Sequence, residues 1–350
     1  MSNPPSARKF RAVRARNALY SAIRGYFADA GFDEVETPLL VPAPGMEPHI
    51  TAFETRFVPE MGARGPERPL WLHSSPEYAM KRLLAEEWER IFFLGKVFRN
   101  GEIARTHNPE FTMLEFYRAN LVDGPKAGRG YGPILVDIEE FTLRGAEALA
   151  GGTKIEWNGA PVDLTPPWDR LSVAEAFASR AGIELPLDGD AALLRARAQE
   201  RGFDIPEAFT SFDDVFFAVF LTAIEPGLGW PRPTFLVDWP ASMASLAKLR
   251  VDDPLVAERF ELYIGGMELA NGFFELNDSA EQRRRLEEEQ RFRASLGKPV
   301  YPIDDRFVDA VGRMPTAAGV AVGIDRLLML LGGFSSIDET LLFPACEEMT

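Results

Sequence analysis

The chain has 350 residues with 38 Lys and Arg against 53 Asp and Glu, so its formal net charge is −15. Its single cysteine, Cys346, excludes a disulfide framework and any multi-cysteine metal site. The negative charge argues against a broad surface for nucleic acid, which needs clustered Lys and Arg. No stretch approaches the roughly 18 uninterrupted apolar residues of a membrane span, and no apolar signal core follows the basic N-terminus, so a cytoplasmic protein is expected.

Helical and strand patterns follow one another in the first third of the chain. Apolar residues recur at helical spacing up to Gly31, and Ser75-Pro76 is a typical helix start with Pro at the first helical position. The elements expected there are a helix over residues 8–30, a strand at Val35 closed by Pro38, a helix from Ser75, and buried strands over 91–98 and 111–117. The prolines at 42, 44 and 48 predict a loop.

The sequence pattern changes between about residues 120 and 230, where a Gly-rich stretch over 121–133 is followed by helical patterns. The elements expected after residue 120 are helices over 135–150, 172–181 and 190–201, strands over 234–238, 260–264 and 267–276, a helix over 280–295, a strand over 319–324 and a helix over 325–331. Strands at the two ends with helices between favour an α+β fold with a largely antiparallel sheet flanked by helices. We expect one domain over residues 1–350 with a helical insertion at about 120–230.

Three glutamates stand seven residues apart in an apolar stretch, at Glu261, Glu268 and Glu275. Carboxylates are rarely placed among apolar strand residues unless they are paired or bind a cation. If Gly265-Gly266 makes a hairpin turn, Glu261 and Glu268 can face one another, and carboxylate oxygens suit Mg²⁺. The alternative, in which these glutamates point outward to solvent, is compatible with the same spacing.

A polar loop connects the predicted strands over 91–98 and 111–117. Its residues with possible chemistry are Arg99, Glu102, Arg105, His107 and Asn108. An arginine fixed at a strand end can bind a carboxylate or a phosphate through two hydrogen bonds, and Phe111 can stack on a base. Glu115 then stands beside Tyr117 in the second apolar strand. The alternative interpretation is a surface hairpin with a few ion pairs.

The stretch GVAVGIDRLLMLL, residues 319–331, predicts a strand that leads into a helix. Small residues let a backbone approach a ligand, and the helix N-terminus together with Arg326 favours an anion. By itself this pattern is weak, because Gly-rich strand-to-helix turns are common. The chain has no Walker loop, GxGxxG fingerprint or nucleophile elbow, and its three histidines make no metal pair, so Rossmann dehydrogenases and P-loop kinases are disfavoured.

Together these segments resemble the three signature motifs of class II aminoacyl-tRNA synthetases. The long N-terminal helix with the strand and Pro38 resembles motif 1, which builds the homodimer interface in that family. FRN with THNPEFTMLEFY resembles motif 2, and GVAVGIDRLLML resembles motif 3. HNPEFTMLE and ELANGFFELND are similar to lysyl-tRNA synthetases in particular, and the resemblance extends from about residue 8 to Pro344.

The resemblance implies a role for each matched residue. Arg99 would be catalytic at the α-phosphate and substrate carboxylate, Arg326 would be catalytic at the terminal phosphate, and Glu261 and Glu268 would hold Mg²⁺. The residues implied in ATP binding are Arg99, Asn100, Gly101, Glu102, His107, Asn108, Phe111, Glu268, Leu269, Gly323 and Arg326. The residues implied in binding the amino-acid substrate are Ser75, Pro76, Glu77, Glu115, Tyr117, Asn271, Glu275 and Ala321.

Acids at both ends of the implied substrate site match a long amino acid with two amines. Ser75 and Glu77 would bind the amine near the reacting carboxylate. Glu115, Tyr117 and Glu275 would hold the distal ammonium. Acids are needed at both ends because an unpaired buried ammonium costs several kcal/mol.

Motif 1 begins within the first residues, which leaves no room for the anticodon-binding OB-fold of a bacterial lysyl-tRNA synthetase. The chain therefore resembles the stand-alone synthetase paralogues that modify translation elongation factor P, as do SSPEYAMKRLL and WPASMASLAKL. That resemblance implies activation of (R)-β-lysine, or lysine, as an adenylate with ATP and Mg²⁺, and transfer to a lysine side chain of the factor. It also implies a homodimer that acts without tRNA.

Two positions depart from the synthetase pattern. The order Arg99-Asn100-Gly101-Glu102 displaces the acid of motif 2 by one residue. Ala321 stands where lysyl-tRNA synthetases have glycine, so an extra methyl group would narrow the pocket beside the substrate backbone. We hypothesise that Ala321 disfavours α-lysine and suits an amine that is moved one carbon along.

The alternatives are a truncated lysyl-tRNA synthetase, a tRNA-free ligase that forms a small amide, and an inactive regulatory paralogue. The acidic charge and the missing OB-fold argue against the first, and the lysine-type acids argue against the second. Retention of Arg99, Glu268 and Arg326 argues against the third.

Overall fold

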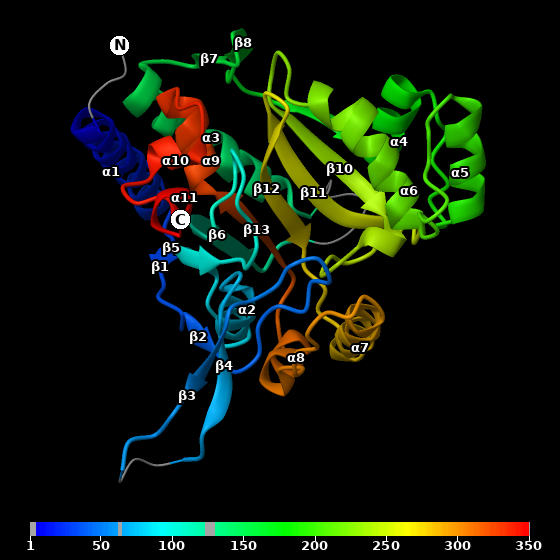
Figure 1. Cartoon of the computed structure of the whole chain (residues 1–350), viewed down its shortest axis with the longest axis horizontal. Helices are drawn as coiled ribbons and strands as arrows, with labels where there is room; N and C mark the ends of the chain where they lie inside the picture. Colours follow the sequence, from blue (N-terminus) through cyan, green and yellow to red (C-terminus); the bar gives the residue numbers. More distant parts are fainter. Residues whose placement is uncertain (1–4, 62–64, 123–129, 350) are drawn as a thin grey trace. The chain divides into compact units, whose positions relative to one another are not determined.

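The computed structural model describes residues 5–61, 65–122 and 130–349 (Figure 1), so the middle of the Gly-rich stretch predicted over 121–133 lies outside the described residues. The chain divides into two compact units. Unit 1 comprises Met1–Asn120, Asn277–Ala317 and Ala321–Thr350, and unit 2 comprises Leu121–Leu276 and Ala318–Val320. Among the described residues, every helix is too short or too polar to span a bilayer.

Unit 1 contains the N-terminal helix, two groups of strands and the C-terminal helices. Its strands are β1 (Asp33–Glu34), β2 (Leu40–Val41), β3 (Glu54–Phe57), β4 (Arg68–Leu72), β5 (Arg90–Phe98) and β6 (Glu110–Ala119). Its helices are α1 (Pro5–Asp29), α2 (Glu77–Leu84), α7 (Ser279–Ser295), α8 (Asp305–Val311), α9 (Ile324–Gly332), α10 (Ile337–Thr340) and α11 (Ala345–Glu348). Strand β13 (Ala317–Gly323) is divided, because its middle residues belong to unit 2.

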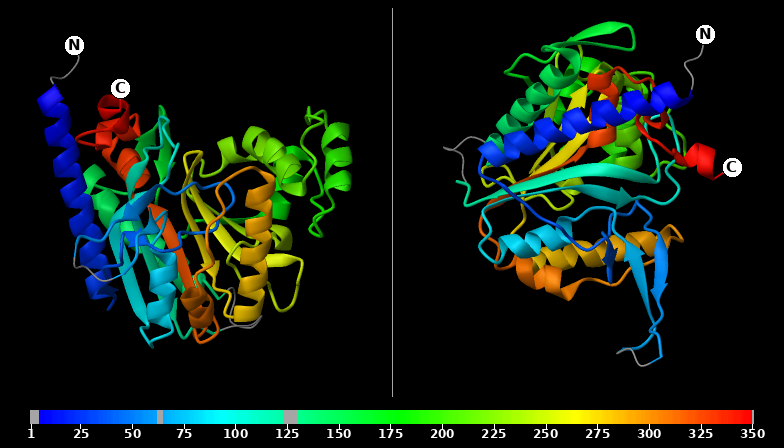
Figure 2. Two further views of the ribbon diagram at one scale, coloured as in Figure 1. Left: turned by 60° about the horizontal axis from the view of Figure 1, so that its bottom comes forward. Right: turned by 90° about the vertical axis from the view of Figure 1, so that its left-hand side faces the viewer.

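The sheet of unit 1 is built on the antiparallel pair β5 and β6, and β1 adds to β5 in parallel. The apolar stripe of α1 contains Leu19, Ile23 and Phe27, all fully buried, and Phe27 stacks on Phe92 of β5 with 4.6 Å between ring centroids. Helix α1 also lies beside α9 and α10 (Figures 1 and 2). The predicted helix over 8–30 and the strands over 91–98 and 111–117 are therefore confirmed.

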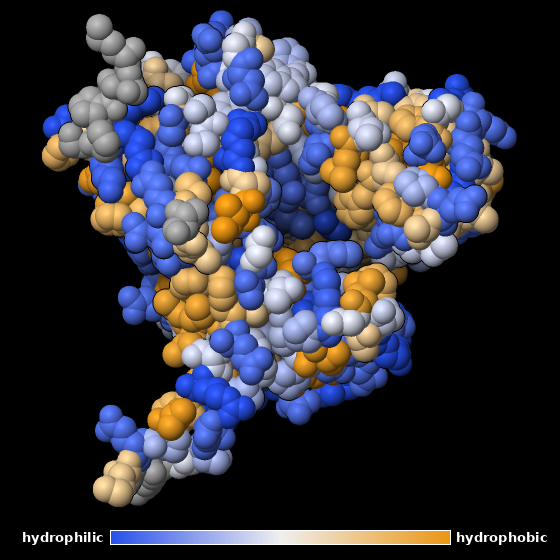
Figure 3. All heavy atoms as spheres, in the orientation of Figure 1, coloured by the Kyte–Doolittle hydropathy of each residue, from blue (hydrophilic) through white to orange (hydrophobic). Residues whose placement is uncertain are grey.

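The loop predicted from the prolines at 42, 44 and 48 is confirmed, since no strand includes these residues. A second, three-stranded sheet with the order β2-β4-β3 was not expected; β2 precedes this loop, and β3 and β4 follow it. All four residues of β3 are exposed, so no alternation of apolar and polar residues marks it in the sequence. The projecting β3–β4 ribbon carries exposed Phe57, Val58 and Met61, and apolar atoms are visible on it in Figure 3.

Unit 2 contains the predicted helical region and, among its described residues, six complete strands. Its strands are β7 (Lys154–Trp157), β8 (Ala160–Asp163), β9 (Asp169–Ser172), β10 (Thr234–Pro240), β11 (Val256–Ile264) and β12 (Met267–Phe274). Its α-helices are α3 (Gly132–Ala150), α4 (Val173–Ala176), α5 (Ala191–Glu200) and α6 (Phe212–Val219). Its 3₁₀ or π turns are η1 (Phe177–Ala181), η2 (Phe220–Ile224), η3 (Glu225–Gly227) and η4 (Ala241–Met243).

Strands β10, β11 and β12 pair antiparallel, and β9 adds to β10 in parallel. Gly265 and Gly266 form the β11–β12 turn with φ of +62° and +75°, the left-handed conformation that a tight hairpin needs. Both units thus agree with the expected α+β fold and largely antiparallel sheet. The buried core of unit 2 is rich in aromatic residues, where Trp239 of β10 packs with Phe216 of α6 and Phe220 of η2.

The predicted helices over 135–150, 172–181 and 190–201 are present as α3, α4 with η1, and α5. The β7–β8 hairpin in the same region was not expected. Its turn, Asn158-Gly159, has φ of +48° and +77°, and an Asn-Gly pair between strands is a strong hairpin signal. The signal was present in the sequence, but the helical patterns on either side outweighed it.

Candidate active site

The predicted site residues fall into two sets, one in each unit. Those in unit 1 are Ser75, Pro76, Glu77, Arg99, Asn100, Gly101, Glu102, His107, Asn108, Phe111, Glu115, Tyr117, Ala321, Gly323 and Arg326. Those in unit 2 are Glu261, Glu268, Leu269, Asn271 and Glu275.

In unit 1, a carboxylate cluster forms where the start of α2 meets β6. Ser75 Oγ donates a hydrogen bond to Glu115 Oε2, and Tyr117 OH donates to Glu115 Oε1, both at 2.7 Å. The Glu77 backbone N–H in turn donates to Ser75 Oγ at 3.0 Å. We call Ser75, Glu77, Glu115 and Tyr117 the amine cluster. The structure brings together four residues that the sequence places up to 42 positions apart.

Burial controls the charge of the amine cluster. Glu115 is only 2% exposed, and burial, followed by repulsion from Glu77, raises its pKa to about 8. The hydrogen bonds from Ser75 and Tyr117 act in the opposite direction but do not outweigh burial. A cation that enters such a site favours the ionised carboxylate, so the cluster is suited to an ammonium group.

The start of α2 differs slightly from the prediction. Pro76 is the residue that precedes the first turn, with φ −76°, and the helix begins at Glu77 rather than at the proline. Its backbone conformation is already helical, so the missing N–H of Pro76 leaves no hydrogen bond unmade. The shift by one residue places Glu77 in the first turn of the helix.

The motif 2 segment places an arginine beside an aromatic ring. The Arg99 guanidinium lies 5.2 Å from the centroid of Phe111, and Arg99 Nη1 lies 4.0 Å from Glu102 Oε1. Arg99 Nε is buried and has no hydrogen-bond partner among the described residues. A buried, unused donor on a guanidinium is suited to an anionic ligand. Gly101, which precedes the displaced Glu102, has φ +89°, a conformation that favours glycine.

Two asparagines of motif 2 form hydrogen bonds within the protein. The Asn100 backbone N–H donates to Thr51 O at 2.8 Å. Asn108 is buried, its Oδ1 accepts from the Ala345 N–H at 2.9 Å, and its Nδ2 donates to Glu110 O at 2.6 Å. Asn108 thus fixes the loop, and only its remaining amide proton and acceptor capacity are available to a nucleotide.

Arg326 of motif 3 contacts the motif 2 loop. Its Nη2 lies 2.5 Å from His107 Nε2, and its Nε donates to Thr106 O at 3.2 Å. Burial lowers the pKa of His107, and the positive charge of Arg326 adds to this effect. A neutral imidazole can accept the hydrogen bond from Arg326, so His107 orients the guanidinium.

The residue before Arg326 was missed by the sequence reasoning. Asp325 is 1% exposed, pairs with Arg16 of α1, and accepts a hydrogen bond from the Thr112 N–H at 2.6 Å. An acid within the apolar run GIDRLL was the available signal. Gly323 is the N-cap residue of α9. Ala321 packs against a buried apolar cluster that includes Met80 and Met113.

In unit 2, acids and an amide share one face of the β11–β12 hairpin. Glu261 lies opposite Asn271, and Glu268 lies opposite Tyr263, so the two glutamates are diagonal neighbours rather than a directly facing pair. The register shifts at this point, and Leu269 is the extra residue of the bulge. Glu261 is 5% exposed, so the interpretation that it points to solvent is wrong.

Glu261 and Glu268 repel each other on the hairpin. Glu261 accepts from Tyr263 OH at 2.6 Å and from Arg259 Nη2 at 2.7 Å. Burial and then repulsion from Glu268 raise the pKa of Glu261 to about 7. Asn271 Oδ1 is buried and has no hydrogen-bond partner among the described residues. Two carboxylates and an unused amide oxygen fit Mg²⁺, which takes few protein ligands and keeps several waters.

Glu275 lies just beyond the end of β12, apart from the other two glutamates along the strand. It is 1% exposed, and its backbone forms an antiparallel bridge with Ala247. Across the described residues, no group of three or more His, Cys, Asp or Glu could hold a metal ion. A magnesium site in unit 2 would therefore use Glu261, Glu268 and Asn271 rather than three acids.

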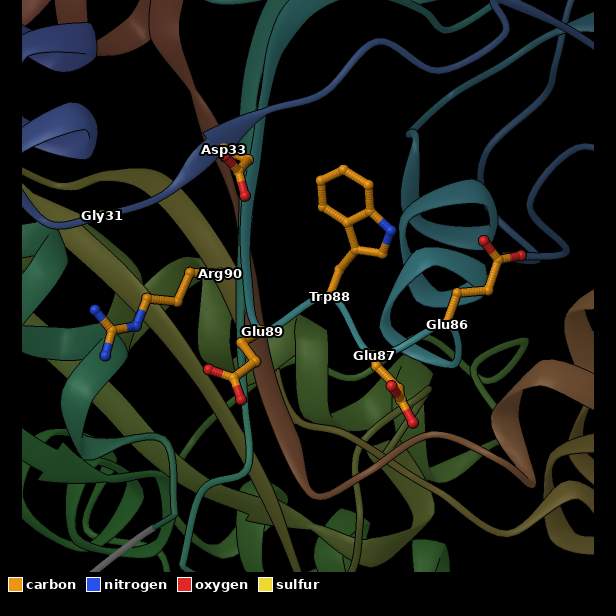
Figure 4. Close-up of a pocket in the computed structure, with 7 residues that line it drawn as sticks. All are labelled: Gly31, Asp33, Glu86, Glu87, Trp88, Glu89 and Arg90. Carbon is orange, nitrogen blue, oxygen red and sulfur yellow. The ribbon is translucent and has the colours of Figure 1, made fainter.

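None of the predicted site residues lines the open hollow of unit 1 that Figure 4 shows. Its lining residues are Gly31, Asp33, Glu86, Glu87, Trp88, Glu89 and Arg90. The carboxylates are spread around it rather than directed at one point (Figure 4), and Glu89 and Arg90 bond to Asn120 and Ala30 O. We assign no chemistry to it.

Comparison with known proteins adds a family to this geometry. The family of class II tRNA synthetases (D, K and N) matches residues 6–347. A protein of Proteus mirabilis (strain HI4320), named elongation factor P–(R)-β-lysine ligase, is 38% identical over 328 residues, 93% of this chain and 92% of the relative. A protein of the same name from Yersinia enterocolitica (strain NCTC 13174 / 8081) is 38% identical over 331 residues, 94% of this chain and 93% of the relative.

Proposed function

Because the chain belongs to the class II tRNA synthetase family and is an ATP-dependent ligase, we propose that it forms an adenylate of (R)-β-lysine, or lysine, and transfers the aminoacyl group to a lysine side chain of elongation factor P. The amine cluster is the observation that carries the proposal. Glu115 is buried, hydrogen-bonded at both oxygens and held next to a second acid. Two neighbouring buried acids are suited to bind a cationic group.

The first step forms a mixed anhydride. The substrate carboxylate attacks the α-phosphorus, the bond to the bridging oxygen of the β-phosphate breaks, and pyrophosphate leaves. Arg99 is proposed to neutralise charge at the α-phosphate, Arg326 at the terminal phosphate, and Phe111 to stack on adenine. Positioning and fixed positive charge perform this step without a covalent enzyme intermediate.

The second step forms an amide. The neutral amine of the acceptor lysine attacks the carbonyl carbon of the anhydride, AMP leaves, and the amine proton is released. Mg²⁺ fits the hairpin of unit 2, where Glu261, Glu268 and Asn271 would hold it, and its charge would offset that of the ATP phosphates. The remaining proposals are a cytoplasmic homodimer built on α1, one catalytic domain over residues 1–350, and action without tRNA.

Mass spectrometry of the acceptor tests this function. The enzyme is incubated with ATP, Mg²⁺, elongation factor P and either (R)-β-lysine or lysine, and we expect the factor to gain the mass of one aminoacyl group. An Arg99→Ala variant serves as the inactive control. Aminoacylation of tRNA with no change in the factor would support a truncated lysyl-tRNA synthetase, and no ATP–pyrophosphate exchange at all would support an inactive paralogue.

Ala321 tests the choice between the two lysines. We propose that its methyl group disfavours α-lysine, so Ala321→Gly should shift the preference in ATP–pyrophosphate exchange towards α-lysine. A preference equal to that of the wild-type enzyme would contradict this role.

A further inference from the structure

A buried lysine lies directly behind the amine cluster. Lys81 of α2 has no exposed surface, and its Nζ lies 2.6 Å from Glu77 Oε1. Its other neighbours include the ring of Phe307, whose centroid lies 6.0 Å from Nζ. Lysine is almost never fully buried, because the loss of water around an ammonium must be offset by a close negative charge. An apolar residue at this position would pack without that cost.

Contacts link Lys81 to the rest of the amine cluster through Glu77. Lys81 follows Glu77 by four residues, so α2 places the two side chains on the same face, one turn apart. The Glu77 backbone N–H donates to Ser75 Oγ, and the Ser75 hydroxyl donates to Glu115. The positive charge of Lys81 also favours the ionised form of Glu115. One internal ammonium thus acts on both acids of the cluster.

We propose that Lys81 is a positioning residue for substrate binding, whose ammonium holds Glu77 Oε1 so that the other carboxylate oxygen is presented to an amine of the substrate. This inference rests on the proposed function of the amine cluster. Without Lys81, Glu77 and Glu115 would be two neighbouring buried acids, and the uptake of a proton would remove a charge that the substrate needs.

A double-mutant cycle tests the proposal. KM for (R)-β-lysine and for ATP is measured by ATP–pyrophosphate exchange in the wild type, Lys81→Met, Glu77→Gln and the double variant. Each single change should raise KM for (R)-β-lysine about tenfold or more and leave KM for ATP unchanged, since one buried charged contact contributes at least about 1.4 kcal/mol. The double variant should bind (R)-β-lysine no worse than Glu77→Gln, because Lys81 acts through Glu77.

Folding effects are separated by two further variants. Lys81→Gln keeps a hydrogen-bond donor for Glu77, and its KM for (R)-β-lysine should lie between those of the wild type and Lys81→Met. Arg24→Met removes the cation of a half-exposed pair with Glu34 in the same unit and should change neither KM. Thermal melting of every variant reports its folded fraction, and the double variant should melt closest to the wild type, since it removes both buried charges.

Two outcomes overturn the inference. Losses that add in the double variant, or a Lys81→Met enzyme with the wild-type KM for (R)-β-lysine, would show that Lys81 does not act through Glu77. If the wild-type enzyme instead shows no exchange with either lysine, the proposed function itself fails, so the two failures are distinguishable.

Discussion

The two units use the same local arrangement to hold a buried glutamate. Glu115 on β6 and Glu261 on β11 each accept a hydrogen bond from a tyrosine two residues later, at 2.7 Å from Tyr117 and 2.6 Å from Tyr263. Residues two apart on a strand share a face, so a Glu-x-Tyr sequence is enough to form the contact. In both units, burial and a second acid raise the pKa of the glutamate.

The second donor distinguishes the two units. Glu115 receives its other hydrogen bond from a neutral hydroxyl, Ser75, whereas Glu261 receives it from the guanidinium of Arg259. Burial is the largest cause of the raised pKa of both glutamates, and the charge of Arg259 acts to lower the pKa of Glu261. The hydrogen bonds of Glu115 come from neutral hydroxyl groups, so among the described residues no cation is in direct contact with its carboxylate, which suits a substrate ammonium that binds and leaves. A carboxylate beside a permanent guanidinium is suited to share a divalent ion with a second acid.

The largest expected effect comes from the charge of Glu115. Glu115→Gln keeps the shape of the side chain but removes the charge that binds the ammonium, and the loss of about 3 kcal/mol for a buried ion pair corresponds to a rise in KM of roughly 150-fold. ATP–pyrophosphate exchange with (R)-β-lysine measures it. KM for ATP should remain that of the wild type, and an equal rise in both constants would mean that the variant is misfolded or that the cluster does not bind the amine.

A smaller effect is expected from the two tyrosines, which are a matched pair. Tyr117→Phe and Tyr263→Phe each remove one hydroxyl and leave the ring in place, at a cost of about 1 to 2 kcal/mol or roughly tenfold. Tyr117→Phe should raise KM for (R)-β-lysine, and Tyr263→Phe should raise the Mg²⁺ concentration that gives half-maximal exchange. If both variants change the same constant, the proposed division between an amine site and a magnesium site is wrong.

The sequence carried the Glu-x-Tyr contacts but not their outer partners. An acid in an apolar strand, next to a tyrosine at even spacing, is visible in one segment of the chain, so Glu115 and Glu261 could be predicted from local pattern. The pair between Arg16 and Asp325 joins residues 309 positions apart, and only the packed fold brings them together. No spacing in the sequence indicates such a pair.

The same limit applies to register and to exposed strands. The bulge at Leu269 decides which residues of the hairpin face one another, and it depends on the packing of both strands. Strand β3 has no buried residue to impose an apolar pattern, so the sequence does not mark it as a strand. Lys81 was visible only as one more polar residue of a helix, since nothing local marks a lysine as buried.

The pH dependence of stability provides a finer test of the two glutamates. Both have a pKa in the folded protein far above the roughly 4.3 of an unfolded glutamate, so the folded state holds more protons between these values. The free energy of unfolding therefore decreases as pH rises from about 4.3 to the pKa in the folded protein. That pKa is about 8 for Glu115 and about 7 for Glu261.

The corresponding Gln variants do not titrate at these positions. Relative to the wild type without ligands, Glu115→Gln and Glu261→Gln should each gain about 1 to 3 kcal/mol of unfolding free energy as pH rises from about 5 to 8. Urea titrations at a series of pH values measure the difference, and the gain of each variant should level off once the pH exceeds the raised pKa of its glutamate. A constant difference at every pH would contradict the raised pKa values.

The smallest effect on the free energy of unfolding is expected when an exposed ion pair is removed. The Arg24–Glu34 pair has good geometry, with Arg24 Nη2 2.8 Å from Glu34 Oε1, but its side chains are 47% and 39% exposed. Water screens both charges, so Arg24→Met should cost less than about 0.5 kcal/mol of unfolding free energy. Lys81→Met removes the cation of a pair with a similar distance and leaves Glu77 in a buried site, so its cost in the same urea titration should be several times larger. Equal costs would mean that water reaches the Lys81–Glu77 pair in solution, and the orientation of Glu77 would then have to come from the helix alone.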